Sequence, residues 1–223
     1  MRRFKEFYNK VEILKILRQE FNKGFFDIVP TVENNKCEYK LFTNLNLIEY
    51  KDKIENTLNK LRENSKRNIP KMSIENYDDA LSILPFHKKS TTKLNTISLC
   101  AEEIIQIIHN NKELAILKGS CSKFLCYDIG EILPANINYT VIGKEQIKTL
   151  INIIEVYCKF NNLQYKTNVK EDSKKGYIKI ENILVITFDN NLKYIEDIKH
   201  NKCFNVLTYP LEILDKLKTT KNK

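Results

Sequence analysis

The segment 116–138 limits the possible folds of this chain more than any other part of the sequence. An apolar run leads into Gly119 and Ser120, a short helical pattern follows, and an extended run with polar residues at alternate positions begins near residue 136. A glycine–serine pair at this point is typical of a strand-to-helix turn, where the backbone N–H groups of the first helical turn remain available. Because residues at i and i+2 of a strand share a face, Asn136 and Asn138 are expected on one surface of a sheet.

Helices and strands alternate throughout the second half of the chain. Apolar residues recur at three- and four-residue steps in the helical segments, and shorter runs rich in β-branched residues separate them. The expected strands span 114–118, 136–142, 163–169, 176–188 and 203–207, and the expected helices span 97–110, 120–127, 144–160, 191–200 and a last segment starting at Pro210. Because 163–169 and 176–188 form a hairpin, the sheet is expected to be mixed in direction and covered by helices.

The first half of the chain has a different pattern. We expect helices over 3–22, 47–64 and 73–84, and short strands within 25–46 around a turn at Asn34-Asn35. A polar and basic segment, 87–93, is the expected domain boundary. The sequence therefore predicts an α+β protein, with a mainly helical N-terminal domain over residues 1–93 and a mixed-sheet domain over residues 94–223.

The net charge limits the kind of binding partner, and the cysteines limit the cellular compartment. The formal net charge is +9, which favours anionic partners and nucleic acid first, although an AT-rich coding bias toward lysine would give the same excess. The sequence has neither an apolar run near the roughly 20 residues of a membrane span nor an apolar N-terminal leader. The six cysteines form no CxxC pair and lie near no histidine at ligand spacing, so we expect reduced, buried cysteines in an intracellular protein without a zinc site.

Basic residues gather in three short clusters that are candidate nucleic-acid contacts. The clusters are Lys66, Arg67 and Lys71; Lys88, Lys89 and Lys93; and Lys216, Lys218 and Lys221. Surface lysines are also commonly solvated without a binding role, and this simpler explanation applies to each cluster as well.

Enzymes that transfer nucleotides need two devices that this sequence partly provides. One is a turn with free N–H groups at a helix N-terminus, which holds the triphosphate. The other is a set of carboxylates on adjacent strands, which bind two Mg²⁺ ions. Gly119 and Ser120 suit the first device. An Asp-x-Asp strand would supply the second, and here that strand carries Asn136 and Asn138.

Residues 99–219 resemble the nucleotidyltransferase domain of the poxvirus-type poly(A) polymerase catalytic subunit. Gly119-Ser120-x-Ser122, followed by Phe124-Leu125, resembles the Gly-Ser helix of that family, and Asn136-Ile137-Asn138 falls where the family has Asp-Ile-Asp. Segment 206–218 resembles the strand, proline and helix that close the domain. The resemblance implies phosphate binding at Gly119 and Ser120, a viral and cytoplasmic setting such as a viral factory or virion, and RNA or an active polymerase subunit as partner, the latter in a hetero-dimer.

The sequence departs from this family at the metal ligands. Each asparagine removes a full negative charge, so two such changes should abolish tight Mg²⁺ binding. The third carboxylate of the fold lies on a neighbouring strand, here 182–189, where the matching position is expected to be apolar and Asp189 is expected to be a turn residue. Asp128 and Glu131 could supply ligands in a shifted alignment, but a helix C-cap next to them explains both more simply.

These observations lead to one leading expectation and two alternatives. The leading expectation is a catalytically inactive nucleotidyltransferase-fold protein without a metal cofactor, which acts in RNA binding or as a partner subunit of a polymerase. The first alternative is an active, Mg²⁺-dependent nucleotidyltransferase that uses Asp128, Glu131 or Asp189. The second alternative is a structural virion protein without a catalytic role.

Overall fold

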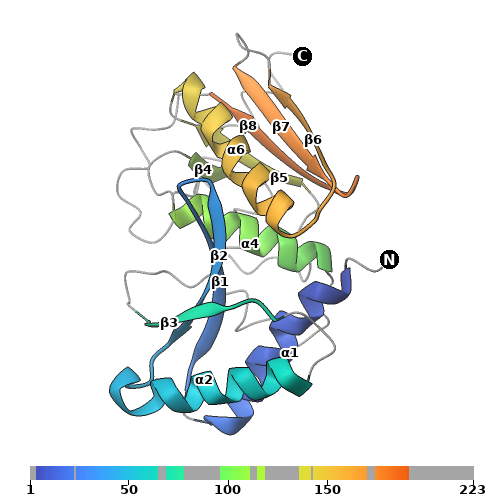
Figure 1. The fold of residues 1–223 in the computed structure, drawn as a ribbon. Helices are drawn as coiled ribbons and strands as arrows, with labels where there is room; N and C mark the ends of the chain where they lie inside the picture. Colours follow the sequence, from blue (N-terminus) through green and yellow to red (C-terminus); the bar gives the residue numbers. More distant parts are fainter. Residues whose placement is uncertain are drawn as a thin grey trace. The chain divides into compact units, whose positions relative to one another are not determined.

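The chain forms two compact units, Met1–Ile83 and Leu84–Lys223, each with its own β-sheet (Figure 1). The computed structural model describes residues 4–22, 24–64, 69–77, 96–110, 115–118, 136–141, 143–169 and 174–190. Helices and strands occur in both units, so the class is α+β, as predicted. The expected boundary segment 87–93 lies outside the described residues. None of the described helices has both the length and the hydrophobicity needed to cross a membrane.

The first unit combines two helices with a three-stranded sheet. Its elements are α1 (Phe4–Glu20), β1 (Phe26–Glu33), β2 (Lys36–Thr43), α2 (Leu47–Asn64) and β3 (Met72–Asn76). The strand order is β1-β2-β3, with β1 antiparallel and β3 parallel to β2. Asn34 and Asn35 join β1 to β2 with φ angles of 50° and 58°, a conformation that asparagine tolerates and that two-residue hairpin turns require. The predicted turn and the helices over 3–22 and 47–64 are confirmed within two residues.

The prediction of a helix over 73–84 is wrong at its start, because Met72–Asn76 is a strand that pairs with β2. The local pattern alternates, with Ile74 buried between the more exposed Ser73 and Glu75. That period of two is the signature of a strand, and pairing with β2 satisfies the backbone groups. Residues 78–84 lie outside the described residues.

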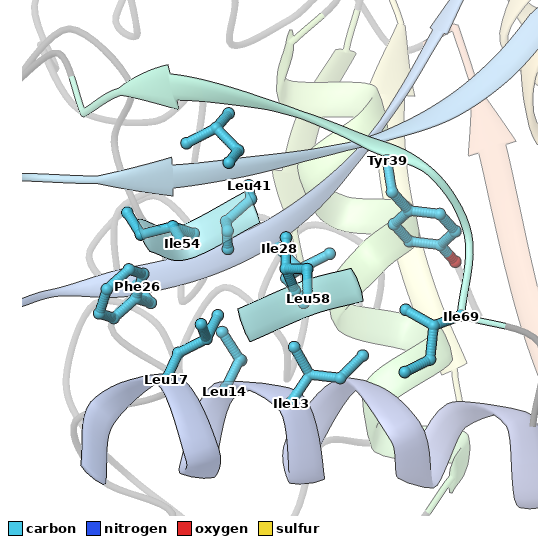
Figure 2. Close-up of a cluster of buried hydrophobic side chains, with 11 residues drawn as sticks. Ile13, Leu14, Leu17, Phe26, Ile28, Tyr39, Leu41, Ile54, Leu58 and Ile69 are labelled. Atoms are coloured by element: carbon cyan, nitrogen blue, oxygen red, sulfur yellow. The ribbon is translucent and has the colours of Figure 1, made fainter. Parts of the chain in front are cut away.

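The core of the first unit lies between its helices and its sheet. Figure 2 shows Leu14 and Leu17 projecting from α1 toward Phe26 on β1. The buried cluster comprises Ile13, Leu14, Leu17, Phe26, Ile28, Tyr39, Leu41, Ile54, Leu58, Ile69 and Ile74. Both helices and all three strands contribute to it, so the apolar stripes read from the sequence are the surfaces that pack.

The second unit contains a mixed five-stranded sheet. Its elements are α4 (Thr96–Asn110), β4 (Ala115–Lys118), β5 (Asn136–Val141), α6 (Lys144–Phe160), β6 (Tyr165–Val169), β7 (Lys175–Ile180) and β8 (Leu184–Asp189). The strand order is β4-β5-β8-β7-β6, in which β5 and β8 are parallel and the other pairs are antiparallel. The predictions of a mixed sheet and of the helices over 97–110 and 144–160 are confirmed. The elements expected over 120–127, 191–200 and 203–207 and the last helix from Pro210 lie outside the described residues.

The single strand expected over 176–188 is instead two strands. Glu181 and Asn182 have φ angles of 49° and 57°, and they reverse the chain so that β7 and β8 form an antiparallel hairpin. Two consecutive left-handed residues match the right-handed twist of the flanking strands. The sequence analysis missed this turn because apolar residues continue on both sides of it.

Helix α6 lies against one face of the five-stranded sheet (Figure 1). Gly176 on β7 shows how close this approach is, since a Cβ atom at that position would lie 2.7 Å from Cγ2 of Ile147 and 3.2 Å from Cδ1 of Ile151. The covered face is apolar and includes Ile137, Ile178 and Ile186. Because side chains alternate along a strand, the neighbours of Gly176 point to the opposite face.

Cys37, Cys100 and Cys158 are buried and form no disulfide, which confirms the expectation of reduced, buried cysteines for these three. Burial raises the pKa of the Cys100 thiol well above its ordinary value, so this thiol is protonated at neutral pH. Helices α4 and α6 are also linked by a buried hydrogen bond, in which the Tyr157 hydroxyl donates to Oε2 of Glu103 over 2.7 Å. Cys121, Cys126 and Cys203 lie outside the described residues.

Candidate functional site

A row of polar side chains crosses all five strands of the second sheet, on the face opposite α6. The strand register aligns five residues from one edge to the other, and these are Asn168, Tyr177, Thr187, Asn138 and Lys118. Neighbouring strands lie about 4.8 Å apart, so each residue is adjacent to the next. The polar row therefore includes Asn138, one of the two asparagines singled out in the sequence.

The polar row continues into a hydrogen-bonded network at the ends of β4, β5 and β8. Oδ1 of Asn138 accepts a hydrogen bond from the Thr187 hydroxyl at 2.5 Å. Asp189 uses both carboxylate oxygens, because Oδ1 accepts from the Thr140 hydroxyl at 2.9 Å and Oδ2 contacts the Lys118 ammonium at 2.5 Å. The charges of Asp189 and Lys118 thus compensate each other in the network. Both side chains are largely buried, with exposed fractions of 26% for Asp189 and 19% for Lys118.

The strand register corrects the role expected for Asp189. This residue is the last one of β8 and lies opposite Thr140, so it is a strand residue with specific partners and the turn assignment is wrong. The β8 residue beside Asn136 is Val185, which is apolar as expected. The β8 residue beside Asn138 is Thr187, so neither asparagine has a carboxylate opposite it on β8.

The described residues of the network do not fit a Mg²⁺ ion. Magnesium needs hard oxygen ligands and usually at least one or two carboxylates that are not already neutralised. Asn138 offers a neutral carbonyl, and Asp189 is paired with Lys118. Within the part of the chain that the structure describes, no three histidine, cysteine, aspartate or glutamate side chains form a metal-binding group.

The other site residues predicted from the sequence can be placed only in part. Asn136 is exposed at the start of β5 and lies on the same face as Asn138. Lys71 is exposed just before β3 in the first unit. The remaining candidates lie outside the described residues, namely Gly119, Ser120, Asp128, Glu131, Lys66, Arg67, Lys88, Lys89, Lys93, Lys216, Lys218 and Lys221.

A hollow of about 470 Å³ adjoins the polar network on β6, β7 and β8. Its lining residues are Asn168, Lys175, Gly176, Tyr177, Thr187, Phe188 and Asp189. The sequence analysis missed most of these residues, as well as Lys118 and Thr140. A signal was present, because lysine, tyrosine and lysine alternate with apolar residues along 175–180 and thereby predict a polar strand face.

The ion pair between Lys118 and Asp189 is expected to stabilise the second unit. A Lys118→Met variant leaves a mostly buried carboxylate without its partner, which should lower the free energy of unfolding by about 1–3 kcal/mol, less than for a fully buried pair because solvent still screens the charge. Adding Asp189→Asn should recover part of this loss, since the amide can still accept from Thr140. Hydrogen exchange of the β5 and β8 amides would measure both effects.

The matched control is an exposed ion pair in the first unit, between Lys53 and Glu49 at 4.0 Å. Both side chains are 59% exposed, so Lys53→Met should change stability by less than about 0.5 kcal/mol. Equal effects of Lys118→Met and Lys53→Met would show that the network does not depend on its central ion pair.

Comparison with known proteins gives no match to this chain among protein-family models, curated proteins or solved structures. Its function is therefore inferred from the residues of the polar row, from the charges around them and from the hollow beside them.

Proposed function

We propose that the second unit is a nucleotidyltransferase-like domain that does not transfer nucleotides and that acts by binding RNA. The arrangement of three strands supports this proposal. In the family that the sequence resembles, the Asp-x-Asp strand follows the Gly-Ser turn and has the strand of the third carboxylate as its neighbour. In this chain β5 follows β4 in sequence and pairs with it. The other neighbour of β5 in the sheet is β8, which runs parallel to β5 and comes after α6 and a hairpin in the chain.

The loss of catalysis is inferred from one observation, the pairing of Lys118 with Asp189 beside Asn138. In a two-metal site, carboxylates converge on cations, and the cations stabilise the attacking and leaving oxygens. Here an ammonium group contacts the one carboxylate among the described residues of this network. A lysine ammonium can hold an anion by charge, but it cannot coordinate and activate two oxygens as a metal pair does.

RNA is the favoured ligand because of the charge of the chain and of this sheet face. The formal net charge is +9. On the described strands of this face the charged side chains are Lys118, Lys166, Lys175, Lys179 and Asp189. Such a basic face attracts a polyanion, and the attraction weakens as salt screens the phosphates.

A direct test combines a primer-extension assay with a binding assay on the full chain. Purified protein is incubated with radiolabelled ATP, a U-rich RNA primer and either Mg²⁺ or Mn²⁺, and RNA binding is measured at several salt concentrations. We expect no extension, together with RNA binding whose affinity falls steeply with salt. Extension of the primer would contradict the proposal and indicate an active enzyme. Absence of both activities would also contradict it and favour a structural role.

A further inference from the structure

Strand β7 presents two lysines with a tyrosine between them on the face opposite α6. Lys175, Tyr177 and Lys179 occupy alternate positions, so their side chains share this face. Lys175 and Tyr177 are exposed, and Tyr177 retains 40% of its accessible surface. The rise of a strand puts the Cα atoms of the two lysines about 13 Å apart, with the aromatic ring midway between them.

The neighbouring strand β6 extends this set. The register places Lys166 beside Lys179 and Asn168 beside Tyr177, and both β6 residues are exposed. Among the ion pairs within the described part of the chain, none involves Lys166 or Lys179. We call Lys166, Asn168, Lys175, Tyr177 and Lys179 the lysine–tyrosine surface.

The hollow of about 470 Å³ lies at this surface and has the size of a small-ligand site. It is lined by Asn168, Lys175, Gly176, Tyr177, Thr187, Phe188 and Asp189. An aromatic ring, a lysine and several hydrogen-bonding groups therefore meet around one space. This combination suits a nucleotide, which has a flat base, hydrogen-bonding edges and an anionic phosphate.

We infer that the lysine–tyrosine surface binds single-stranded RNA, with a base stacked on Tyr177 and phosphates held by the flanking lysines. The inference rests on the proposed function, since it names the surface through which the chain binds RNA. Stacking on an exposed ring requires an unpaired base, because the bases of a duplex are stacked on one another. Asn168 can meet the base edge or the ribose 2′-hydroxyl, the group that distinguishes RNA from DNA.

The test measures the affinity of the full chain for a fluorescein-labelled, U-rich single-stranded RNA of about 12 nucleotides, a length in the range of single-strand binding sites. Tyr177→Leu removes the ring and keeps an apolar side chain, and we expect a roughly 5- to 100-fold rise in Kd. Tyr177→Phe keeps the ring and should bind within about twofold of the wild type, by the same stacking argument.

The contribution of the lysines is tested through the salt dependence of RNA binding. Each phosphate contact to a single strand contributes about 0.7 to the slope of log K against log salt. Lys175→Ala with Lys179→Ala should therefore reduce the slope by about 1.4. The matched control is Lys148→Ala with Lys159→Ala, which removes two exposed lysines from α6 on the other side of the sheet.

The outcomes separate this inference from the proposed function. If the wild type binds the RNA but Tyr177→Leu and the β7 lysine pair lose no more affinity than the α6 control, the inference is wrong and RNA binding by the chain still stands. If the wild type does not bind RNA, the proposed function fails as well. An unlabelled RNA duplex that competes as well as the single strand would overturn the stacking part of the inference. Circular dichroism of each variant confirms that the exposed substitutions leave the fold intact.

Discussion

A Lys118→Met, Asn138→Asp double variant is expected to bind Mn²⁺ with a dissociation constant of about 1 mM or tighter, a gain over the wild type. The change removes the ammonium that neutralises Asp189 and adds a second carboxylate at position 138 of β5, between Lys118 on β4 and Thr187 on β8. Affinity for hard cations rises with the number of uncompensated carboxylates, and weak calcium sites have dissociation constants of about 10⁻⁴–10⁻³ M. Isothermal titration calorimetry of the double variant against the wild type measures the gain.

Two single variants are the controls for this experiment. Lys118→Met alone frees one carboxylate, and Asn138→Asp alone adds one that Lys118 can still neutralise, so neither should bind as tightly as the double variant. If the double variant binds no more Mn²⁺ than Lys118→Met, then the β5 and β8 positions do not converge as a metal site requires. That result would also weaken the proposal that the second unit is a nucleotidyltransferase-like domain.

Phe26→Ala is expected to lower the free energy of unfolding of the first unit by about 3–5 kcal/mol, because truncation of a buried aromatic side chain removes apolar burial and leaves a cavity. Phe26 is fully buried and belongs to the cluster drawn in Figure 2. Its ring centroid lies 5.8 Å from that of Phe21. Leu17 and Leu41 belong to the same core. Hydrogen exchange of the β1 and β2 amides reports on this unit separately from the second unit.

The control for this variant is Ile48→Ala on α2. Ile48 is 98% exposed, so its truncation should change stability by no more than about 0.5 kcal/mol. A loss below about 1 kcal/mol for Phe26→Ala would mean that the first unit does not depend on the packing between α1 and its sheet, since truncations in a well-packed core exceed that value.

Two helices and the first hairpin turn were the most predictable parts of the described fold. The helices over 47–64 and 144–160 have the bounds expected from their apolar spacing, and the asparagine pair at 34–35 forms the expected turn. Each of these signals is local, because a helix satisfies its own backbone groups and a two-residue turn depends on the φ angles of its own residues. The misassigned strand at Met72–Asn76 depends instead on pairing with β2, a partner about 30 residues away in the chain.

The candidate site likewise has features that the sequence predicted and features that depend on the tertiary structure. Alternation along a strand was enough to predict that Asn136 and Asn138 share a face, and the lysine count was enough to favour an anionic partner. The importance of Lys118 was not visible in sequence, because its carboxylate partner Asp189 lies 71 residues further along the chain. Nor could the sequence reveal that Thr187, instead of an acid, lies opposite Asn138.

By itself, the sequence determined most of the described helices and strands of this protein, its positive charge and the neutral side chains at the two asparagine positions. Only the tertiary structure decided which strand lies beside β5 and in which register. That arrangement brings an ammonium–carboxylate pair and a row of five polar residues together on one face of the sheet. The physical reason is that a period of two fixes which residues share a face of one strand, whereas the identity and register of the neighbouring strand depend on long-range packing and backbone pairing.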